Sequence, residues 1–345
     1  MEGNLQILFI NIGILKIVVS ENVKKGSELL KIGIIGTGYV GSTTAFALML
    51  QGIVSELVLI DIDKAKAEGE ALDLIQATSF TSPVQIYTGD YSDLQGAEIV
   101  IISAGPSIEK GETRLDLAGK NYAVFRDIVP KIMKYNFGCI LLVVTNPVDV
   151  LSYITLKLSG LPANKVIGSG TVLDSSRFRA TLSVKLKVDP RNIHAYILGE
   201  HGDSQVAAWS LTNIMGISFD DYCTRYMDNC GPAIKEEIET HVRTSAYRII
   251  ERKGATNYAV ALAIAKIVKS ILRDQNSILT VSTYISNYDG IEDVYFSLPC
   301  IVNKNGIEKI IQPALSVQEN QALKESAGVI KSYIDEVLGA CTVTS

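Results

Sequence analysis

The chain has 345 residues, of which 47% are hydrophobic and 20% charged, and its formal net charge at pH 7 is −5. These fractions are typical of a globular protein, and the length allows one large domain or two ordinary ones. The lack of a basic excess argues against nucleic-acid binding. The 5 cysteines form no CxxC pair and no cluster with histidines. This pattern predicts reduced thiols in a cytoplasm and no metal site.

The first 29 residues contain an apolar stretch, LQILFINIGILKIVV (5–19), which Asn11 and Lys16 interrupt. A membrane span needs about 20 apolar residues, and a signal peptide needs a basic start and a small-residue cleavage site. The stretch is short for a span and lacks both signal-peptide features. We therefore predict no membrane association. We assign no function to residues 1–29, which we expect to be an extension packed on the surface or a result of the chosen start.

From Lys31 onward, short apolar runs alternate with helical stretches. Near-continuous runs of Val, Ile and Leu are typical of strands buried on both faces of a parallel sheet. Strands that alternate with helices predict βαβ units and a doubly wound α/β sheet. The predicted strands are 31–36, 57–61, 84–88, 98–103 and 139–145, and the predicted helices are 38–51, 64–79 and 114–135.

After about residue 165 the pattern becomes a mixture of strands and longer helices. No low-complexity linker separates the two halves, so we expect them to pack closely. The predicted elements are a strand at 192–199, a helical stretch at 232–272 interrupted at Gly254, two paired strands at 277–285 and 294–304, and a helix at 317–338.

The motif GTGYVG follows the first predicted strand and opens a helix. In a dinucleotide-binding fold Gly36 permits the tight turn, Gly38 lets the backbone approach a pyrophosphate, and Gly41 lets the helix pack on the strand. Asp61 lies 20 residues after Gly41, at the end of the second strand, where a carboxylate accepts from the adenosine ribose hydroxyls and repels a 2′-phosphate. The motif predicts a nicotinamide or flavin cofactor, with NAD favoured over NADP.

The chain has 3 histidines, so the search for an acid–base group is short. His241 lies in the charged helical segment KEEIETHVRTS, where a solvated side chain is expected. His201 lies in LGEHGDS between Gly199 and Gly202, and such glycines suit a turn that presents a side chain to a cleft. An imidazole titrates near neutral pH and can transfer the proton that accompanies hydride transfer.

A histidine base needs a group that orients its second nitrogen, and GSGTVLDSSRFRA (168–180) offers one. On a helix, Asp174 and Arg177 share a face because they are three residues apart, whereas Arg179 points elsewhere. Asp174 and Arg177 can therefore face one site with His201. An ordinary helix ion pair is the alternative interpretation.

Taken together, several motifs resemble those of the L-lactate/malate dehydrogenase family, most closely its bacterial L-lactate dehydrogenases. They follow the family's order and spacing over about residues 30–340, and they read GTGYVG, VLIDID, GETRLDLAGKN, VVTNPVDV, GSGTVLDSSRFR, LGEHGDS and ERKGAT. The resemblance implies a Rossmann NAD-binding domain at 30–167, a mixed α/β catalytic domain at 168–345 and a homotetramer. It also implies reversible hydride transfer between NADH and pyruvate to give L-lactate.

The resemblance implies roles for individual residues. His201 would donate and accept the proton, Asp174 would hold its tautomer, and Arg177 would bind the substrate carboxylate through two hydrogen bonds. Arg114 would polarise the substrate carbonyl as its loop closes and excludes water. Asn146 and Thr256 would line the substrate, and the cofactor would be bound by Gly36, Gly38, Tyr39, Val40, Gly41, Asp61, Lys66, Tyr91, Gly105, Thr145, Asn146 and Ser169.

Two further positions, Arg179 and His194, match those at which many bacterial members bind the activator fructose 1,6-bisphosphate between subunits. The alternative interpretation of these two residues is a plain polar surface. We expect activation, because both motifs match.

The loop SAGPSIEKGETR (103–114) departs from the family pattern. Ile108 lies where lactate enzymes usually have Gln and malate enzymes have Arg. Oxaloacetate would bury its second carboxylate against an aliphatic group at a cost of several kcal/mol, which disfavours malate as the substrate. Pyruvate fits, and so does 4-methyl-2-oxopentanoate, whose three extra carbons could gain about 2.4 kcal/mol, or roughly fiftyfold. We favour a neutral replacement in a lactate enzyme over a hydroxyisocaproate-type dehydrogenase.

Two other classes remain as alternatives. NAD-dependent glycosidases share a related Rossmann domain but need metal ligands, and no Cys/His cluster is apparent in the sequence. A non-catalytic NAD-binding protein would be expected to have lost His201, Asp174, Arg177 or Arg114, and all four are present.

Overall fold

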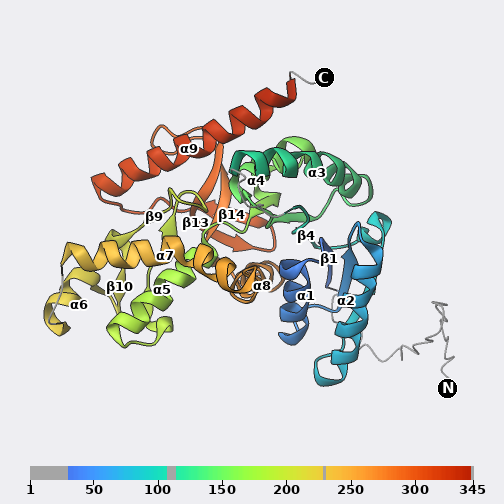
Figure 1. Cartoon of the computed structure of the whole chain (residues 1–345), viewed down its shortest axis with the longest axis horizontal. Coiled ribbons are helices and arrows are strands. Elements are labelled where there is room, and N and C mark those ends of the chain that lie inside the picture. Colours follow the sequence, from blue (N-terminus) through green and yellow to red (C-terminus); the bar gives the residue numbers. More distant parts are fainter. Residues whose placement is uncertain (1–29, 107–113, 228–230, 343–345) are drawn as a thin grey trace.

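The computed structural model describes residues 30–106, 114–227 and 231–342 (Figure 1). Its main element is a nine-stranded sheet. Six parallel strands form one part of this sheet in the order β6-β5-β4-β1-β2-β3, which is the order of a doubly wound dinucleotide-binding fold. These strands are β1 (Lys31–Ile35), β2 (Glu56–Ile60), β3 (Gln85–Thr88), β4 (Ile99–Ile102), β5 (Ile140–Val143) and β6 (Val166–Gly168).

Both faces of the parallel strands are covered by helices, as their continuous apolar sequences predicted. On one face, Val100 and Leu141 pack in a core with Phe125. On the other, Ile34 and Ile101 pack in a second core. The first face is covered by α3 (Arg114–Tyr135), α4 (Val148–Ser159) and α9 (Val317–Thr342), and the second by α1 (Tyr39–Leu50), α2 (Lys64–Ala77) and α8 (Tyr258–Leu272).

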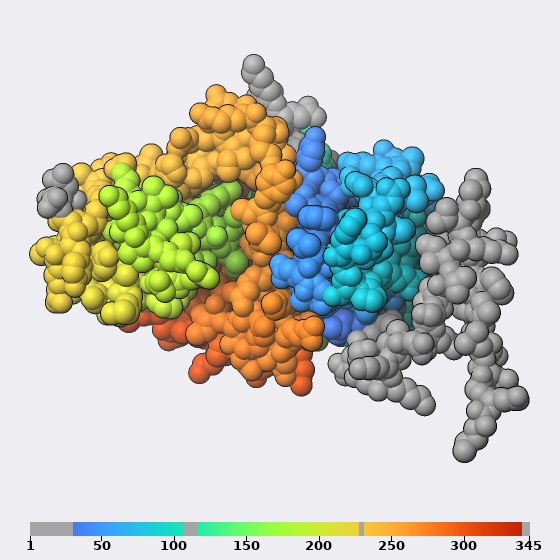
Figure 2. All heavy atoms as spheres, turned by 90° about the horizontal axis from the view of Figure 1, so that it is seen from below, coloured from blue at the N-terminus to red at the C-terminus, as the bar shows by residue number. Residues whose placement is uncertain are grey.

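Three antiparallel strands extend the same sheet beyond β6. They are β12 (Ser277–Ile285), β13 (Val294–Asn303) and β14 (Gly306–Ile310). The pairing of β12 with β13 confirms the predicted strand pair, whereas the continuity with β6, through Ser282 and Gly168, was not predicted. In addition, α8 (orange), from the second half of the chain, lies against α1 (blue), from the first half, as Figure 2 shows. The two halves therefore share a sheet and a helix contact.

The remaining second half is built from short strands and helices. The predicted strand at 192–199 is wrong: β7 pairs with β10, whereas β8 pairs with β9 in another small sheet, so the chain changes sheets at Ala195 and Tyr196. Gly254, with φ of +84°, ends α7 as expected. The elements are α5 (Val172–Leu186), β7 (Ile193–His194), β8 (Ile197–Leu198), β9 (Val206–Ala207), β10 (Asn213–Ile214), β11 (Ile217–Ser218), α6 (Phe219–Tyr226) and α7 (Pro232–Lys253), with 3-10 helices at Thr78–Phe80, Tyr91–Leu94, Ala163–Lys165, Pro190–Asn192 and Trp209–Leu211.

The structure can be compared with two predictions, the state of the cysteines and the absence of a membrane span. Cys139 and Cys300 are free and buried, but Cys223 is disulfide-bonded. The prediction of reduced thiols is therefore wrong at Cys223, because spacing along a sequence does not show which side chains meet in space. No helix of the described residues is long and apolar enough to cross a membrane. The apolar stretch 5–19 lies outside the described residues.

Candidate active site

The predicted cofactor residues collect at one edge of the parallel sheet. Gly36 follows β1, Asp61 follows β2, Gly105 comes shortly after β4, Thr145 after β5, and Ser169 directly after β6. Because these strands are parallel neighbours, their carboxyl ends meet at the same edge. Strand order reverses direction between β1 and β4, and ligands of doubly wound sheets bind at that point.

The three glycines of GTGYVG meet different steric requirements. Gly36 has φ of +93°, and a Cβ there would lie 2.5 Å from the backbone nitrogen of Ala104. A Cβ on Gly41 would lie 1.9 Å from the Gly36 carbonyl oxygen. Around Gly38, by contrast, nothing lies within 4 Å of the Cβ position. The turn is therefore tight on the protein side and open in front of the α1 N-terminus, which fits a pyrophosphate.

The Asp61 carboxylate is held at the end of β2. Its Oδ2 accepts from the backbone nitrogen of Thr37 at 2.6 Å and from its hydroxyl at 3.0 Å, and its Oδ1 accepts from the Asp63 nitrogen at 3.0 Å. Partial burial alone would raise the pKa of Asp61, but these hydrogen bonds outweigh it and hold the pKa below its usual value. Asp61 is thus ionised at neutral pH and retains lone pairs that can accept from ribose hydroxyls.

Replacing Asp61 with Ser tests this reading of the adenosine side. The change removes a charged acceptor, so we expect KM for NADH to rise about tenfold and the preference for NADH over NADPH to shrink. Steady-state kinetics with each cofactor measure both quantities. The control is Asp90→Asn. Asp90 and Asp61 line one hollow, but Asp90 pairs with Lys64. An unchanged cofactor preference in Asp61→Ser would contradict the assignment.

The residues predicted to line the nicotinamide side lie close together behind β4 and β5. Gly105 has φ of +142°, and a Cβ there would lie 2.3 Å from Oδ1 of Asn121. The Asn121 amide donates to the Asn146 carbonyl at 2.7 Å, and the Thr145 hydroxyl donates to Ala104 at 2.8 Å. Asn121 is fully buried and was not predicted, although it lies in the quoted motif GETRLDLAGKN.

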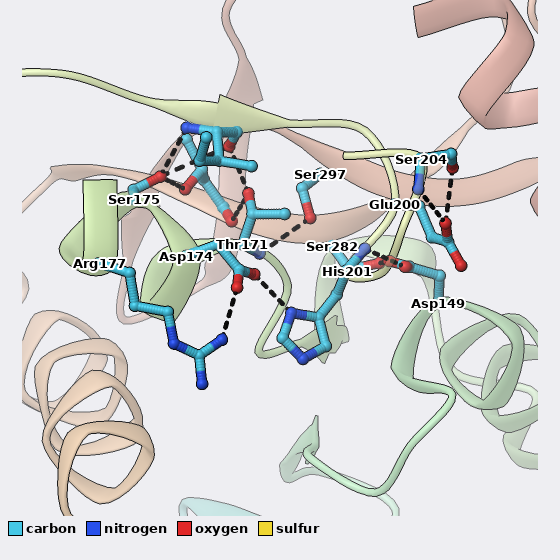
Figure 3. Close-up of polar contacts among 12 residues, drawn as sticks. Asp149, Thr171, Asp174, Ser175, Arg177, Glu200, His201, Ser204, Ser282 and Ser297 are labelled. Atoms are coloured by element: carbon cyan, nitrogen blue, oxygen red, sulfur yellow. Dashed lines mark hydrogen bonds and ion pairs between the residues drawn. The ribbon is translucent and has the colours of Figure 1, made fainter. Parts of the chain in front are cut away.

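A buried carboxylate joins the predicted catalytic residues (Figure 3). Asp174 lies in the first turn of α5 and is 3% exposed. One of its oxygens is 2.5 Å from Nδ1 of His201, and the other accepts from Arg177 at 2.8 Å. The spacing argument placed Asp174 and Arg177 on one face, and the structure shows them paired. The imidazole points its second nitrogen, Nε2, away from Asp174 (Figure 3).

The charges of this group stabilise one another. Burial alone would raise the pKa of Asp174, but His201 and Arg177 hold it below its usual value. Burial alone would lower the pKa of His201, but the Asp174 carboxylate outweighs burial and raises it. The pair therefore favours an ionised Asp174 carboxylate beside a protonated His201 imidazole. A proton donor beside a guanidinium suits an anionic substrate that carries a carbonyl.

The turn that carries His201 joins β8 and β9 and is fixed by side chains from distant elements. The Glu200 backbone nitrogen donates to the Ser326 hydroxyl of α9 at 2.9 Å. Asp149 of α4 accepts from the His201 nitrogen at 2.8 Å. Asp149 was quoted within VVTNPVDV but given no role. A carboxylate inside the apolar run VDVLSYITL was the available signal, because a buried charge requires a partner.

The other predicted residues are not part of the group formed by Asp174, His201 and Arg177. Tyr39 and Val40 open α1, and Tyr39 is 73% exposed. Lys66 lies in the first turn of α2, Tyr91 begins the 3-10 helix after β3, and Thr256 lies half-buried between α7 and α8. Arg114 is the first residue of α3. The side chain of Arg114 and the whole of Ile108 lie outside the described residues.

The predicted activator residues lie on another side of α5. Arg179 donates to the Ala195 carbonyl at 3.0 Å. Arg179 and His194 line one hollow of about 240 Å³, together with Arg191. Arg177, two residues earlier, instead pairs with Asp174. Helix α5 thus directs Arg177 to Asp174 and Arg179 to the hollow that His194 also lines.

The dinucleotide-binding sheet and the adjacent Asp–His–Arg group define a class, that of NAD-dependent dehydrogenases. Comparison with known families specifies it further. Residues 30–168 match the NAD binding domain of lactate/malate dehydrogenases, and residues 171–340 match the alpha/beta C-terminal domain of the same family. The chain belongs to the lactate/malate dehydrogenase family.

Individual relatives are similar over almost their whole length. L-lactate dehydrogenase 1 of Clostridium acetobutylicum is 53% identical over 307 residues, covering 89% of this chain and 98% of that protein. The L-lactate dehydrogenase of Acetivibrio thermocellus is 54% identical over 305 residues, covering 88% and 96%. The crystal structure of the ligand-bound minor L-lactate dehydrogenase from Enterococcus mundtii superposes with a TM-score of 0.86 at 42% identity, covering 89% and 98%.

Proposed function

We propose that this protein is an NAD-dependent L-lactate dehydrogenase, which converts pyruvate and NADH reversibly into L-lactate and NAD. The observation that carries the proposal is the buried Asp174 carboxylate, which contacts both His201 and Arg177. The similarity to L-lactate dehydrogenases over 89% of the chain supports it.

The residues divide the work as their chemistry allows. NADH, when bound, supplies the hydride that reduces the carbonyl carbon. Arg177 binds the substrate carboxylate through two parallel hydrogen bonds, and His201 gives the Nε2 proton to the carbonyl oxygen. Asp174 stabilises the imidazolium before transfer and keeps the remaining proton on Nδ1. We assign Arg114, at the start of α3, to the polarisation of the carbonyl.

The substrate side chain is assigned from the sequence. Ile108 offers no cation to a second carboxylate, which supports pyruvate over oxaloacetate. The same aliphatic residue favours a second candidate, an L-2-hydroxy-acid dehydrogenase of the hydroxyisocaproate type, whose larger apolar substrates would gain from contact with it. The similarity to proteins named L-lactate dehydrogenase favours the first.

Product analysis tests the proposal. The purified full chain is incubated with NADH and pyruvate, and the product is separated on a chiral column. The proposal expects L-lactate in an amount equal to the NADH consumed. NADH binding without any product would support a non-catalytic NAD-binding protein, and D-lactate would contradict the assigned stereochemistry.

We further propose a cytoplasmic homotetramer that fructose 1,6-bisphosphate activates. Cationic side chains at the hollow of Arg179 and His194 suit phosphate groups. We expect the activator to lower KM for pyruvate by about tenfold, and Arg179→Gln to remove this response. Lys185→Gln is the matched control, because Lys185 lies on α5 but pairs with Glu237. Equal activation of the Arg179→Gln variant and the unmodified enzyme would contradict the activator site.

A further inference from the structure

A second buried carboxylate lies on the other side of the His201 turn from Asp174 (Figure 3). Asp149, in the first turn of α4, is 3% exposed. Its Oδ2 accepts from the His201 backbone nitrogen at 2.8 Å, and its Oδ1 accepts from the Ser282 hydroxyl of β12 at 2.6 Å. Asp174 therefore holds the imidazole ring of His201, whereas Asp149 holds its backbone.

The surroundings of Asp149 are tightly packed and polar. A Cβ on Gly168 would lie 2.6 Å from the Ser152 hydroxyl and 2.7 Å from Cβ of Ser282. The junction of α4, β6 and β12 thus has no room for a larger side chain. Small residues here let Ser282 reach the carboxylate. The position of Asp149 is fixed by packing as well as by its two hydrogen bonds.

The charged groups around this carboxylate are few. Those that act on Asp149 are His201 and, with the opposite effect, Glu200. Those that act on His201 are Asp174 and Asp149, which favour its protonated form, and Arg177, which opposes it. When Asp149 is ionised, its described cationic neighbour is therefore the imidazole of His201.

The hydrogen-bond pattern tolerates both protonation states of Asp149. Burial raises the pKa of Asp149 to about 7, although the bonds from Ser282 and His201 counteract the shift. The His201 nitrogen can only donate, so Oδ2 accepts in either state. A hydroxyl can donate or accept, so Ser282 can serve an ionised or a protonated Oδ1. The geometry around His201 is thus kept while the charge of Asp149 changes with pH.

We propose that Asp149 and Ser282 are positioning residues that hold the His201 turn, and that the charge of Asp149 helps to keep the imidazole protonated for pyruvate reduction. This inference rests on the proposed lactate dehydrogenase function. Asp149 does not touch the reacting atoms. It acts through His201, from the NAD-binding half of the chain, and so links the cofactor domain to the proton donor.

The experiment compares Asp149→Asn, Ser282→Ala and the control Ser152→Ala in the full chain. Ser152 lies one turn after Asp149 on α4, is fully buried, and its hydroxyl has no hydrogen-bond partner among the described residues. The readouts are kcat/KM for pyruvate and for L-lactate as functions of pH, the Kd of NADH, and the pH titration of the histidine ring signals by NMR.

We expect Asp149→Asn to lower kcat/KM for pyruvate by about tenfold at neutral pH with an unchanged Kd for NADH. Removal of the negative charge lowers the pKa of His201. As the pH rises, pyruvate reduction by the variant therefore declines at a lower pH than in the unmodified enzyme. Lactate oxidation likewise begins at a lower pH. Ser282→Ala moves both midpoints in the same direction by less, because Asp149 loses the donor that favours its ionised form.

The pH midpoints distinguish a positioning role of Asp149 and Ser282 from a general loss of protein stability. Loss of stability alone would lower activity at every pH and leave the midpoints in place. Unchanged midpoints and an unchanged His201 titration in both variants would overturn the inference while the dehydrogenase function stands. If Asp149→Asn fails to fold, Ser282→Ala decides by the same two readouts. An unmodified protein that does not reduce pyruvate would overturn both proposals.

Discussion

Replacement of His201 with Asn is expected to lower kcat/KM for pyruvate by roughly 10²- to 10⁴-fold. Asparagine keeps the backbone nitrogen that Asp149 binds, but its side chain has no proton to give at neutral pH. It also leaves the buried Asp174 carboxylate with Arg177 as its remaining cation. The Kd of NADH should stay unchanged, because the cofactor residues lie at the strand ends. Steady-state kinetics and NADH fluorescence titration measure the two quantities.

The control for this variant is His241→Asn. His241 is an exposed residue of α7, and its ring contacts Arg248 at 3.1 Å. We expect kinetics like those of the unmodified enzyme. If His201→Asn also kept most of its activity, the proton transfer assigned to His201 would be wrong, whatever the product analysis showed.

The second large effect is expected from Arg177→Lys. Lysine preserves the charge but cannot form two parallel hydrogen bonds with a carboxylate. The loss of one charge-assisted hydrogen bond costs about 1.5–3 kcal/mol, which corresponds to roughly 10- to 150-fold in kcat/KM. We expect most of this loss in KM, because the carboxylate is bound both before and during the reaction.

Arg179→Lys, measured without fructose 1,6-bisphosphate, is the matched control for Arg177→Lys. Arg179 lies two residues further along α5 and donates to Ala195. The Arg179→Lys variant should have a KM for pyruvate close to that of the unmodified enzyme. Similar losses in the two variants would indicate a general disturbance of α5 instead of a specific carboxylate contact at Arg177.

The parallel half of the fold was predictable because its strands carry their own signal. Residues such as Ile34, Ile101 and Leu141 are fully buried, and continuous apolar runs predicted this burial. The antiparallel extension was predictable as a strand pair but not as part of the main sheet. Its attachment depends on Ser282 meeting Gly168, and no local pattern specifies a contact between residues so far apart. The strand predicted at 192–199 failed for a similar reason, since its halves pair with different partners.

The site was predictable where local geometry limits the choices. Asp174 and Arg177 share a helix face because of their spacing, and glycines on both sides of His201 indicated a presented side chain. Asp149 was missed because its partners, His201 and Ser282, lie 52 and 133 residues away. Long-range contacts between buried polar groups are fixed by tertiary packing, which the sequence motifs do not show.

The most direct test of the proposed function compares two substrates. NADH oxidation by the purified protein is followed with pyruvate and with 4-methyl-2-oxopentanoate, at saturating fructose 1,6-bisphosphate. We predict a higher kcat/KM for pyruvate, which would make Ile108 a neutral replacement in a lactate dehydrogenase. A preference of about tenfold or more for the branched acid would contradict this account and assign the enzyme to larger apolar 2-hydroxy acids.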